Sequence, residues 1–453
     1  MRLMFLVCLF SFSTLFAQSD LLKAPPAFAY KKSMAVFIDL QRADYKITYD
    51  NDQKKALFQA KLSFITEKEG FPLFDLVSTP MKSSLNGKNV QISDIKTPDA
   101  QTTLKVIEQP LAPGSHELMI EGEITELVTF SEGQVRSAFW TSDLQDRNFL
   151  EQYLPANLEY DQVEMKLEVF FKGMSKNHVI YTNGELTKLN DNLYNIDFPS
   201  YFNASSIFFH AVPVGAMVEQ RFSFKSIDGR ELPAVVYLSA SSSWGNPTST
   251  LNTLQERTLK ILSELESDYG PFPHSSITIY NAGSGGMEYC GATMTEMRAL
   301  GHELIHSYFA RGVMPAQGNA GWIDEAIASW RDNGYPTKNS LLGSSQMANH
   351  SVYSRDTDRK AYTFGANFMA YLDGKFKGRG GLKSVLREMT DKMMFQKIST
   401  PDFIKVLNSH YQINTQADFD RYIYSTKEED LKDIKSHHPF HQKMTRKELL
   451  KFL

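Results

Sequence analysis

Two histidines and two glutamates stand at a spacing that suits a metal ion and a proton acceptor. His302 and His306 are separated by three residues, the first of which is Glu303. On a helix this spacing turns both imidazoles to one face, where they can hold zinc, and leaves Glu303 beside the metal to accept a proton from water. Glu325 follows after eighteen intervening residues and completes a His2Glu ligand set, which leaves one position open for water. The pattern therefore predicts a catalytic site with one zinc ion; the alternative is a surface helix in which Glu303 pairs with a neighbour.

Around these residues the chain resembles the M1 family of zinc aminopeptidases, the gluzincins related to leukotriene A4 hydrolase and aminopeptidase N. Residues 322–328 are similar to the Trp-Leu-Asn/Asp-Glu-Gly-Phe-Ala run that carries the third zinc ligand of the family. Residues 285–289 read Gly-Gly-Met-Glu-Tyr, a bacterial variant of the family's Gly-x-Met-Glu-Asn signature. Residues 362–365 resemble the downstream Tyr-x-Lys-Gly stretch, with the lysine replaced and a shorter spacing from Glu325.

The resemblance implies roles for the residues outside the ligand set. Glu288 would lie on the edge strand of the cleft and pair with the free ammonium of a peptide's first residue, so that only the first peptide bond reaches the metal. Gly285 and Gly286 would allow the substrate backbone to approach closely. Tyr362 would donate its phenol to the oxyanion that forms in the reaction. The alternatives are a Gly-Gly turn with a solvated glutamate and a tyrosine that only packs in a core.

Two further residues are candidates for supporting roles. Asp332 lies seven residues after Glu325, two helical turns on, where its carboxylate could orient a zinc-binding histidine through the other ring nitrogen. A charged, exposed helix end is the alternative. Gln152 is a candidate for the glutamine that helps Glu288 to hold the substrate amine in the family.

The elements that must position these residues fall into two units. Residues 19–238 contain short runs of alternating polarity separated by turns, which predicts an all-β N-terminal domain. A linker with Ser, Gly and Pro follows, and apolar residues at helical spacing then predict a helix over 250–268. A strand over 276–280, the zinc helix and helices over 359–426 complete the order of a thermolysin-like α/β catalytic domain, which is expected over 239–453. The fold class is therefore α+β and multidomain.

The first eighteen residues have the charged start, the short apolar stretch and the small residue of a secretory signal peptide. Its removal would leave a mature chain without any later apolar run long enough to hold it in a membrane. We therefore expect an exported protein, periplasmic or secreted, in which Cys290 is the one remaining cysteine and a packing residue. The net charge of −4 offers no basic field for nucleic acid, so no nucleic-acid partner is expected.

These features together predict an exported zinc aminopeptidase that hydrolyses the first bond of peptide substrates. The chain ends 147 residues after His306, so no large C-terminal helical domain is expected, and the cleft should be open to longer peptides. Two other classes remain: a zinc endopeptidase on the same scaffold, and a non-catalytic member that binds peptides or proteins. The Gly-Gly-Met-Glu sequence argues against the first, and the intact Glu303 against the second.

Overall fold

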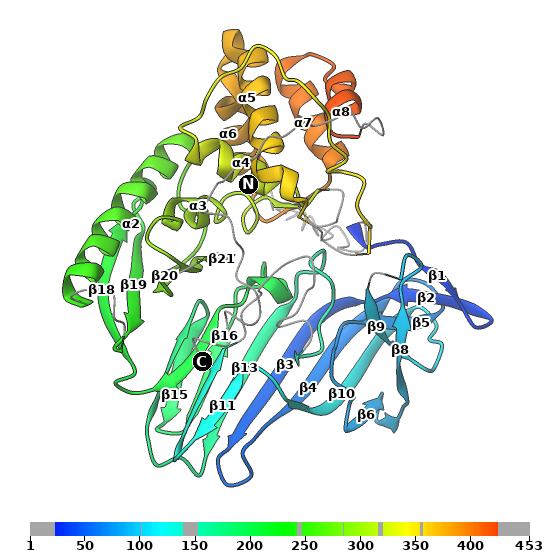
Figure 1. Ribbon diagram of the computed structural model, residues 1–453. Helices are drawn as coiled ribbons and strands as arrows, with labels where there is room; N and C mark the ends of the chain where they lie inside the picture. Colours follow the sequence, from blue (N-terminus) through cyan, green and yellow to red (C-terminus); the bar gives the residue numbers. More distant parts are fainter. Residues whose placement is uncertain are drawn as a thin grey trace, which may run out of the picture.

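The computed structural model describes residues 23–100, 102–138, 153–241, 247–283, 285–315, 320–353 and 357–424. The expected signal peptide and Gln152 lie outside these ranges. The described chain begins with β-sheets and continues as a mixed α/β unit (Figure 1), as the sequence predicts. None of its helices combines the length and the apolar character that a membrane span requires.

The N-terminal unit is built around an eight-stranded sheet. Its strands are, in spatial order, β15 (Glu185–Asn190), β16 (Leu193–Asp197), β13 (Glu164–Lys172), β3 (Asp39–Asp50), β4 (Lys55–Thr66), β10 (Gly114–Ile124), β6 (Lys82–Leu85) and β7 (Lys88–Asn89). Along β4 every second side chain is buried, among them Phe58, Leu62 and Phe64. The other face carries cross-strand ion pairs such as Lys61 with Glu117, so the period of two in the sequence separates core from solvent.

Two smaller sheets complete this unit. One contains, in spatial order, β1 (Phe28–Tyr30), β2 (Ser33–Phe37), β5 (Phe71–Phe74), β9 (Thr103–Ile107) and β8 (Ile92–Lys96). The other contains β11 (Val128–Ser131), β12 (Gln134–Ala138), β17 (Phe209–Pro213) and β14 (His178–Thr182). Val135, Ile180 and Phe209 of this second small sheet belong to the same hydrophobic core as the buried face of the large sheet. The short helix η2 (Ala204–Ser206) precedes β17 and is also buried.

The sheet of the second unit includes two strands that begin before residue 239. Its strands are β18 (Met217–Lys225), β19 (Glu231–Ser239), β20 (Ile277–Asn281), β22 (Ala292–Thr295) and β21 (Gly286–Tyr289). β18 and nearly all of β19 fall within residues 19–238, the predicted N-terminal domain, and β19 pairs in parallel with β20. A hairpin of alternating strands does not reveal locally which sheet it joins.

This sheet lies between two hydrophobic cores. Val236 and Ile279 face the helix α2 (Pro247–Tyr269), whose buried Leu254, Leu262 and Leu265 recur at helical spacing. Other side chains of the same strands, such as Tyr280, join the core of the N-terminal unit. The two units are thus packed together over one face of the sheet, which places its strands β21 and β22 at the junction (Figure 1).

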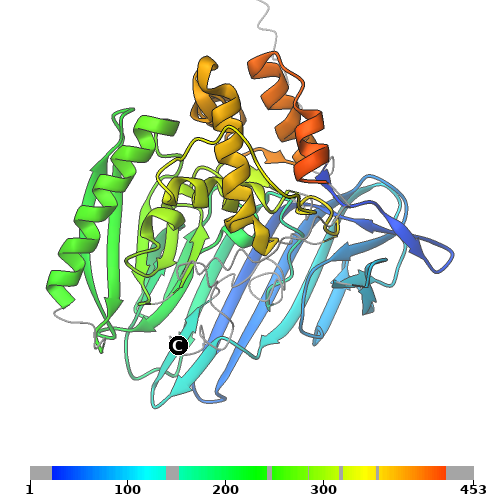
Figure 2. The ribbon, with the colours of Figure 1, turned by 45° about the horizontal axis from the view of Figure 1, so that its top comes forward.

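Helices form the rest of the second unit. They are α3 (Leu300–Ile305), α4 (Ile323–Asp332), η3 (Arg359–Tyr362), α5 (Phe364–Phe376), η4 (Lys377–Arg379), α6 (Gly381–Met393), α7 (Thr400–Tyr411) and α8 (Gln416–Tyr422). A short parallel pair, β23 (Met314–Pro315) with β24 (Lys397–Ile398), ties the segment after α3 to the start of α7. Figure 2 shows α5, α7 and α8 on the side of the molecule away from the long strands of the N-terminal unit.

Candidate metal centre

The helix α3 carries the two histidines of the predicted site. It is only six residues long, it is buried throughout, and His306 forms its C-cap. Because His302 and His306 are four residues apart, their rings lie on one face, with centroids 4.8 Å apart. The structure therefore brings both imidazoles together at the junction of the two units.

Glu325 reaches these histidines from the first turn of α4. Its Oε2 lies 3.0 Å from His302 Nε2 and 3.4 Å from His306 Nε2. Trp322, three residues before Glu325, holds the start of this helix in place. It is fully buried, and its indole N–H donates to Thr400 Oγ1 over 3.0 Å. The third predicted ligand thus comes from a helix whose end is anchored by an aromatic core.

The other ring nitrogen of each histidine contacts an oxygen outside this cluster. His302 Nδ1 lies 2.7 Å from Asp332 Oδ2, and His306 Nδ1 lies 3.1 Å from the carbonyl oxygen of Phe309. Each contact favours a proton on Nδ1, which leaves Nε2 of both rings as a lone-pair donor facing Glu325. The contact favours a role for Asp332 in orienting the ring of His302 over that of a charged, exposed helix end.

The donor atoms fit a zinc ion in number, type and spacing. His302, His306 and Glu325 each offer one buried atom, and the three atoms lie within 4.8 Å of one another. Ligands about 2.0–2.1 Å from a tetrahedral zinc ion stand roughly 3.3 Å apart, close to the two separations from Glu325. Donor atoms of Glu288, His306 and Asp324 also lie within 4.8 Å of one another. Because His306 belongs to both groups, the carboxylates of Glu288 and Asp324 lie beside the same centre.

Glu303 is buried beside the ligands and lies against β21. A Cβ atom added to Gly286 would come within 2.0 Å of Glu303 Oε1, so this glycine leaves the space that the carboxylate occupies. The neighbouring Gly285 has a φ of 68°, a backbone conformation that suits glycine. Burial raises the pKa of the Glu303 carboxyl group above its ordinary value. A carboxyl group with a raised pKa next to a metal is suited to exchange protons.

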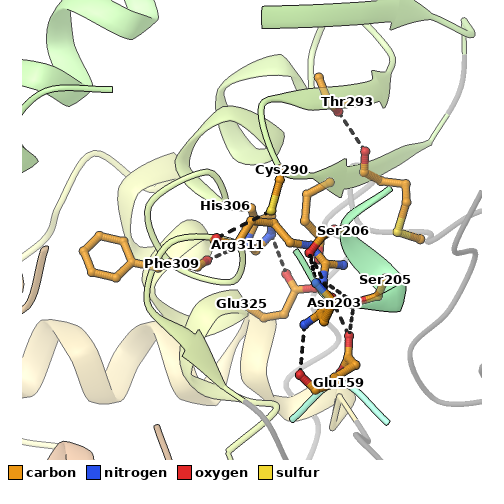
Figure 3. Close-up of polar contacts among 12 residues, drawn as sticks. Glu159, Asn203, Ser205, Ser206, Cys290, Thr293, His306, Phe309, Arg311 and Glu325 are labelled. Atoms are coloured by element: carbon orange, nitrogen blue, oxygen red, sulfur yellow. Dashed lines mark hydrogen bonds and ion pairs between the residues drawn. The ribbon is translucent and has the colours of Figure 1, made fainter. Parts of the chain in front are cut away.

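Glu288 points into the same region from β21, the terminal strand of its sheet. Its side chain is buried, and its Oε1 accepts a long hydrogen bond of 3.4 Å from Arg311 Nη2. No motif in the sequence indicates a role for Arg311. Figure 3 shows its guanidinium between the metal centre and a polar cluster of the N-terminal unit. Its position, five residues after His306, shows that it is close to the site in the sequence. No local pattern, however, indicates that an arginine at this position is buried.

Tyr362 lies at the end of η3 and not within a longer helix. Its hydroxyl donates to Glu325 Oε1 over 2.8 Å, and its ring stacks on that of His302 with centroids 6.3 Å apart. Burial and the Glu325 carboxylate raise the pKa of the Tyr362 phenol, which therefore remains a hydrogen-bond donor. The structure thus places Tyr362 at the centre even though its spacing in the sequence is unusual.

Cys290 follows β21 and behaves as a buried packing residue. Its Sγ lies 3.7 Å from the carbonyl oxygen of Arg311. Burial raises the pKa of the thiol to about 12, so a reactive thiolate is disfavoured.

The β-rich unit, the mixed α/β unit and the histidine helix between them define the fold of the M1 zinc metallopeptidases. The M1 zinc metallopeptidase of Deinococcus radiodurans superposes with a TM-score of 0.63 over 90% of this chain and 99% of its own, at 16% identity. Leukotriene A4 hydrolase of Saccharomyces cerevisiae gives 0.64 over 90% of this chain and 72% of its own, at 12% identity. Aminopeptidase A of Legionella pneumophila gives 0.60 over 87% and 50%, at 14% identity. The sequence itself matches no family model and no curated protein.

Proposed function

We propose that the chain is a zinc-dependent aminopeptidase that removes the first residue of peptides. The observation that carries this proposal is the position of Glu288, a buried carboxylate on a terminal sheet strand next to the His302, His306 and Glu325 cluster. A carboxylate at this place can bind an ammonium group at a set distance from the metal. The likeness to solved metallopeptidases supports the peptidase class.

His302, His306 and Glu325 would hold the metal. When bound, zinc acts as a Lewis acid on a carbonyl group and makes water a nucleophile near neutral pH. Asp332 keeps the ring of His302 oriented for this task, and the carbonyl of Phe309 does the same for His306.

Glu303 serves as the proton carrier of the reaction. It takes a proton from the attacking water and later gives it to the amine that leaves. Its carboxyl group is buried beside the proposed ligands, next to β21. Tyr362, which keeps its phenolic proton, donates a hydrogen bond to the oxyanion that develops on the attacked carbonyl.

Glu288 and β21 bind the substrate. The carboxylate pairs with the free ammonium, and the strand, as the last one of its sheet, can form backbone hydrogen bonds with an extended peptide. Gly285 and Gly286 would let the substrate backbone approach this strand closely. Gly286 also leaves the space that the Glu303 carboxylate occupies.

The test is hydrolysis of fluorogenic aminoacyl amides by the zinc-loaded protein, each offered with a free and with an acetylated amino group, with and without a chelator. We expect cleavage of the free-amine substrates alone, and its loss with the chelator. Equal cleavage of both forms would identify an endopeptidase instead. Binding of zinc without cleavage of any substrate would favour the non-catalytic alternative.

Export is a separate part of the proposal and rests on the apolar N-terminal segment of the sequence. N-terminal sequencing of the protein from the cells that produce it should find a mature chain starting near Ser19. An intact N-terminus in the cytoplasm would contradict export without affecting the proposed activity.

A further inference from the structure

A buried arginine lies directly behind the amine-binding glutamate. Arg311 is 1% exposed, and its two terminal nitrogens point to different units of the molecule. Nη2 donates to Glu288 Oε1 over 3.4 Å, while Nη1 donates to Ser205 Oγ over 2.6 Å and lies 3.5 Å from Glu159 Oε1. Figure 3 shows Arg311 together with Ser205 and Glu159. The residue therefore joins the metal-site unit to the N-terminal unit.

The backbone conformation after α3 directs the Arg311 side chain towards Glu288 and Ser205. After α3 the chain turns sharply, and Arg311 N donates to the carbonyl oxygen of His306 over 2.9 Å. Ala310 adopts a φ of 143° in this turn, which is unfavourable for a residue with a side chain. Such strain persists only where the surrounding contacts hold the backbone in place. The direction of the Arg311 side chain is thus imposed by the fold.

The partners on the N-terminal unit are themselves held rigidly. Ser205 Oγ donates to Glu159 Oε1 over 2.6 Å, and Asn203 Nδ2 donates to the carbonyl oxygen of Glu159 over 2.9 Å. The same segment reaches the strand of Glu288, because Cys290 N donates to the carbonyl oxygen of Ser206. Both sides of Arg311 are therefore fixed with respect to each other.

The charges of Arg311, Glu159 and Glu288 bear on how a substrate amine can be bound. A buried charge is costly unless it is paired, and Arg311 has two buried carboxylates within reach, Glu159 and Glu288. The guanidinium therefore offsets part of the negative charge of these two carboxylates. The charge that remains on Glu288 can attract a substrate ammonium group.

We propose that Arg311 is a positioning residue for amine recognition: it holds Glu288 in place and takes its own orientation from Ser205 and Glu159. Without the guanidinium, Glu288 loses the hydrogen bond from Nη2 and its positively charged neighbour, so its carboxylate is no longer held in position for the substrate amine. The inference rests on the proposed role of Glu288. It makes the N-terminal unit part of the specificity of the enzyme.

The test compares two inhibitors of the zinc-loaded protein that differ only in the amine. Leucine hydroxamate carries an α-amino group, and 4-methylpentanohydroxamic acid is the same molecule without it. A hydrogen-bonded charge pair is worth at least about tenfold in affinity, so the wild type should prefer the amine by that factor. In R311Q this preference should fall to within about threefold, while the zinc content and the Ki of the amine-free compound stay unchanged. For free-amine substrates KM should rise more than kcat falls.

R42Q is the matched control, since Arg42 is a half-exposed arginine on β3 that pairs with Asp44. It should keep the full preference for the amine. A folded R311Q that also keeps this preference would overturn the inference, and so would an equal loss for both inhibitors, which indicates a merely structural role.

If R311Q does not fold, S205A decides the matter. It retains the arginine but removes the hydroxyl that accepts from Nη1, and the preference for the amine should fall by about threefold. An unchanged preference in S205A overturns the inference. A wild type that binds both hydroxamates equally would instead refute the amine-binding role of Glu288, before any variant is compared.

Discussion

Glu303 is adjacent in the sequence to His302, a proposed metal ligand, but its environment comes from residues elsewhere. Gly286 leaves the space for its carboxylate, and burial raises its pKa. A group in this position can accept a proton without binding the metal. Its replacement should therefore separate catalysis from metal binding.

We expect Glu303→Gln to lower kcat by about 10²–10⁴-fold, the usual contribution of a positioned proton carrier. The amide has nearly the same shape but cannot accept the proton. Zinc content, measured by atomic absorption, should remain at one ion per chain. Glu256→Gln, at an exposed site of α2, is the control. Wild-type turnover in Glu303→Gln would exclude the assigned role.

Asp332 should act on the metal through His302. Replacing it with Ala removes the acceptor of the 2.7 Å contact with His302 Nδ1, so the ring loses its orientation. Zinc affinity, measured by competition with a chelator, should fall by about 10–100-fold. Asp391→Ala, at an exposed site of α6, should leave the affinity unchanged. Equal affinities in both variants would show that Asp332 is only a charged helix end.

At the scale of elements, the start of α4 depends on helices that follow much later in the chain. Trp322 packs edge-on against Phe368 of α5 and Phe403 of α7, and it donates to Thr400. Thr400 is the first residue of α7, which begins with a capping box: Ser399 Oγ accepts from Asp402 N, and Asp402 Oδ2 accepts from Ser399 N. The cap thus supports the packing around the helix that carries Glu325.

Ser399→Ala should lower the free energy of unfolding by about 1 kcal/mol, because the first turn of α7 loses its side-chain acceptor. Urea unfolding measures this difference. Ser409→Ala, at an exposed interior site of the same helix, should be neutral or slightly stabilising. The hypothesis fails if the two variants have the same stability.

For the whole molecule, the contact between the two units includes a buried histidine. His274 precedes β20, is 2% exposed and lies between the hydroxyl of Tyr201, 3.3 Å from Nδ1, and the carbonyl of Ser307, 3.1 Å from Nε2. A neutral imidazole satisfies both partners as acceptor and donor. Burial lowers the pKa of His274 to about 3, and the charges of Arg311 and Arg230 act in the same direction.

This histidine should make folding sensitive to acid. Its pKa is lower in the folded than in the unfolded state, so the unfolded state binds the proton first and stability falls as pH drops below about 6.5. His274→Gln can keep both hydrogen bonds but cannot be protonated. In urea unfolding between pH 6 and 4, the variant should lose stability less steeply than the wild type, by up to about 1.4 kcal/mol per pH unit. Parallel stability curves would contradict this account.

Part of the site could be predicted because it is local. The spacing of His302 and His306 determines their common face on any helix, and the alternation along β4 determines which side is buried. The order of a β-rich unit followed by an α/β unit could also be predicted from local patterns of polarity. The pairing of β19 with β20 could not be predicted, because the alternation of a hairpin is the same whichever sheet it joins.

By itself the sequence determined the spacing of the proposed ligands and the glycines beside Glu288, and it predicted the ligand types. Tertiary structure alone decided that Tyr362 reaches Glu325, that Asp332 reaches His302, and that Arg311 lies between Glu288 and Ser205. The physical reason is the range of the interactions. Helical and strand periodicity act between neighbours in the chain, whereas the pairing of buried charges and hydrogen bonds depends on which distant segments are packed together.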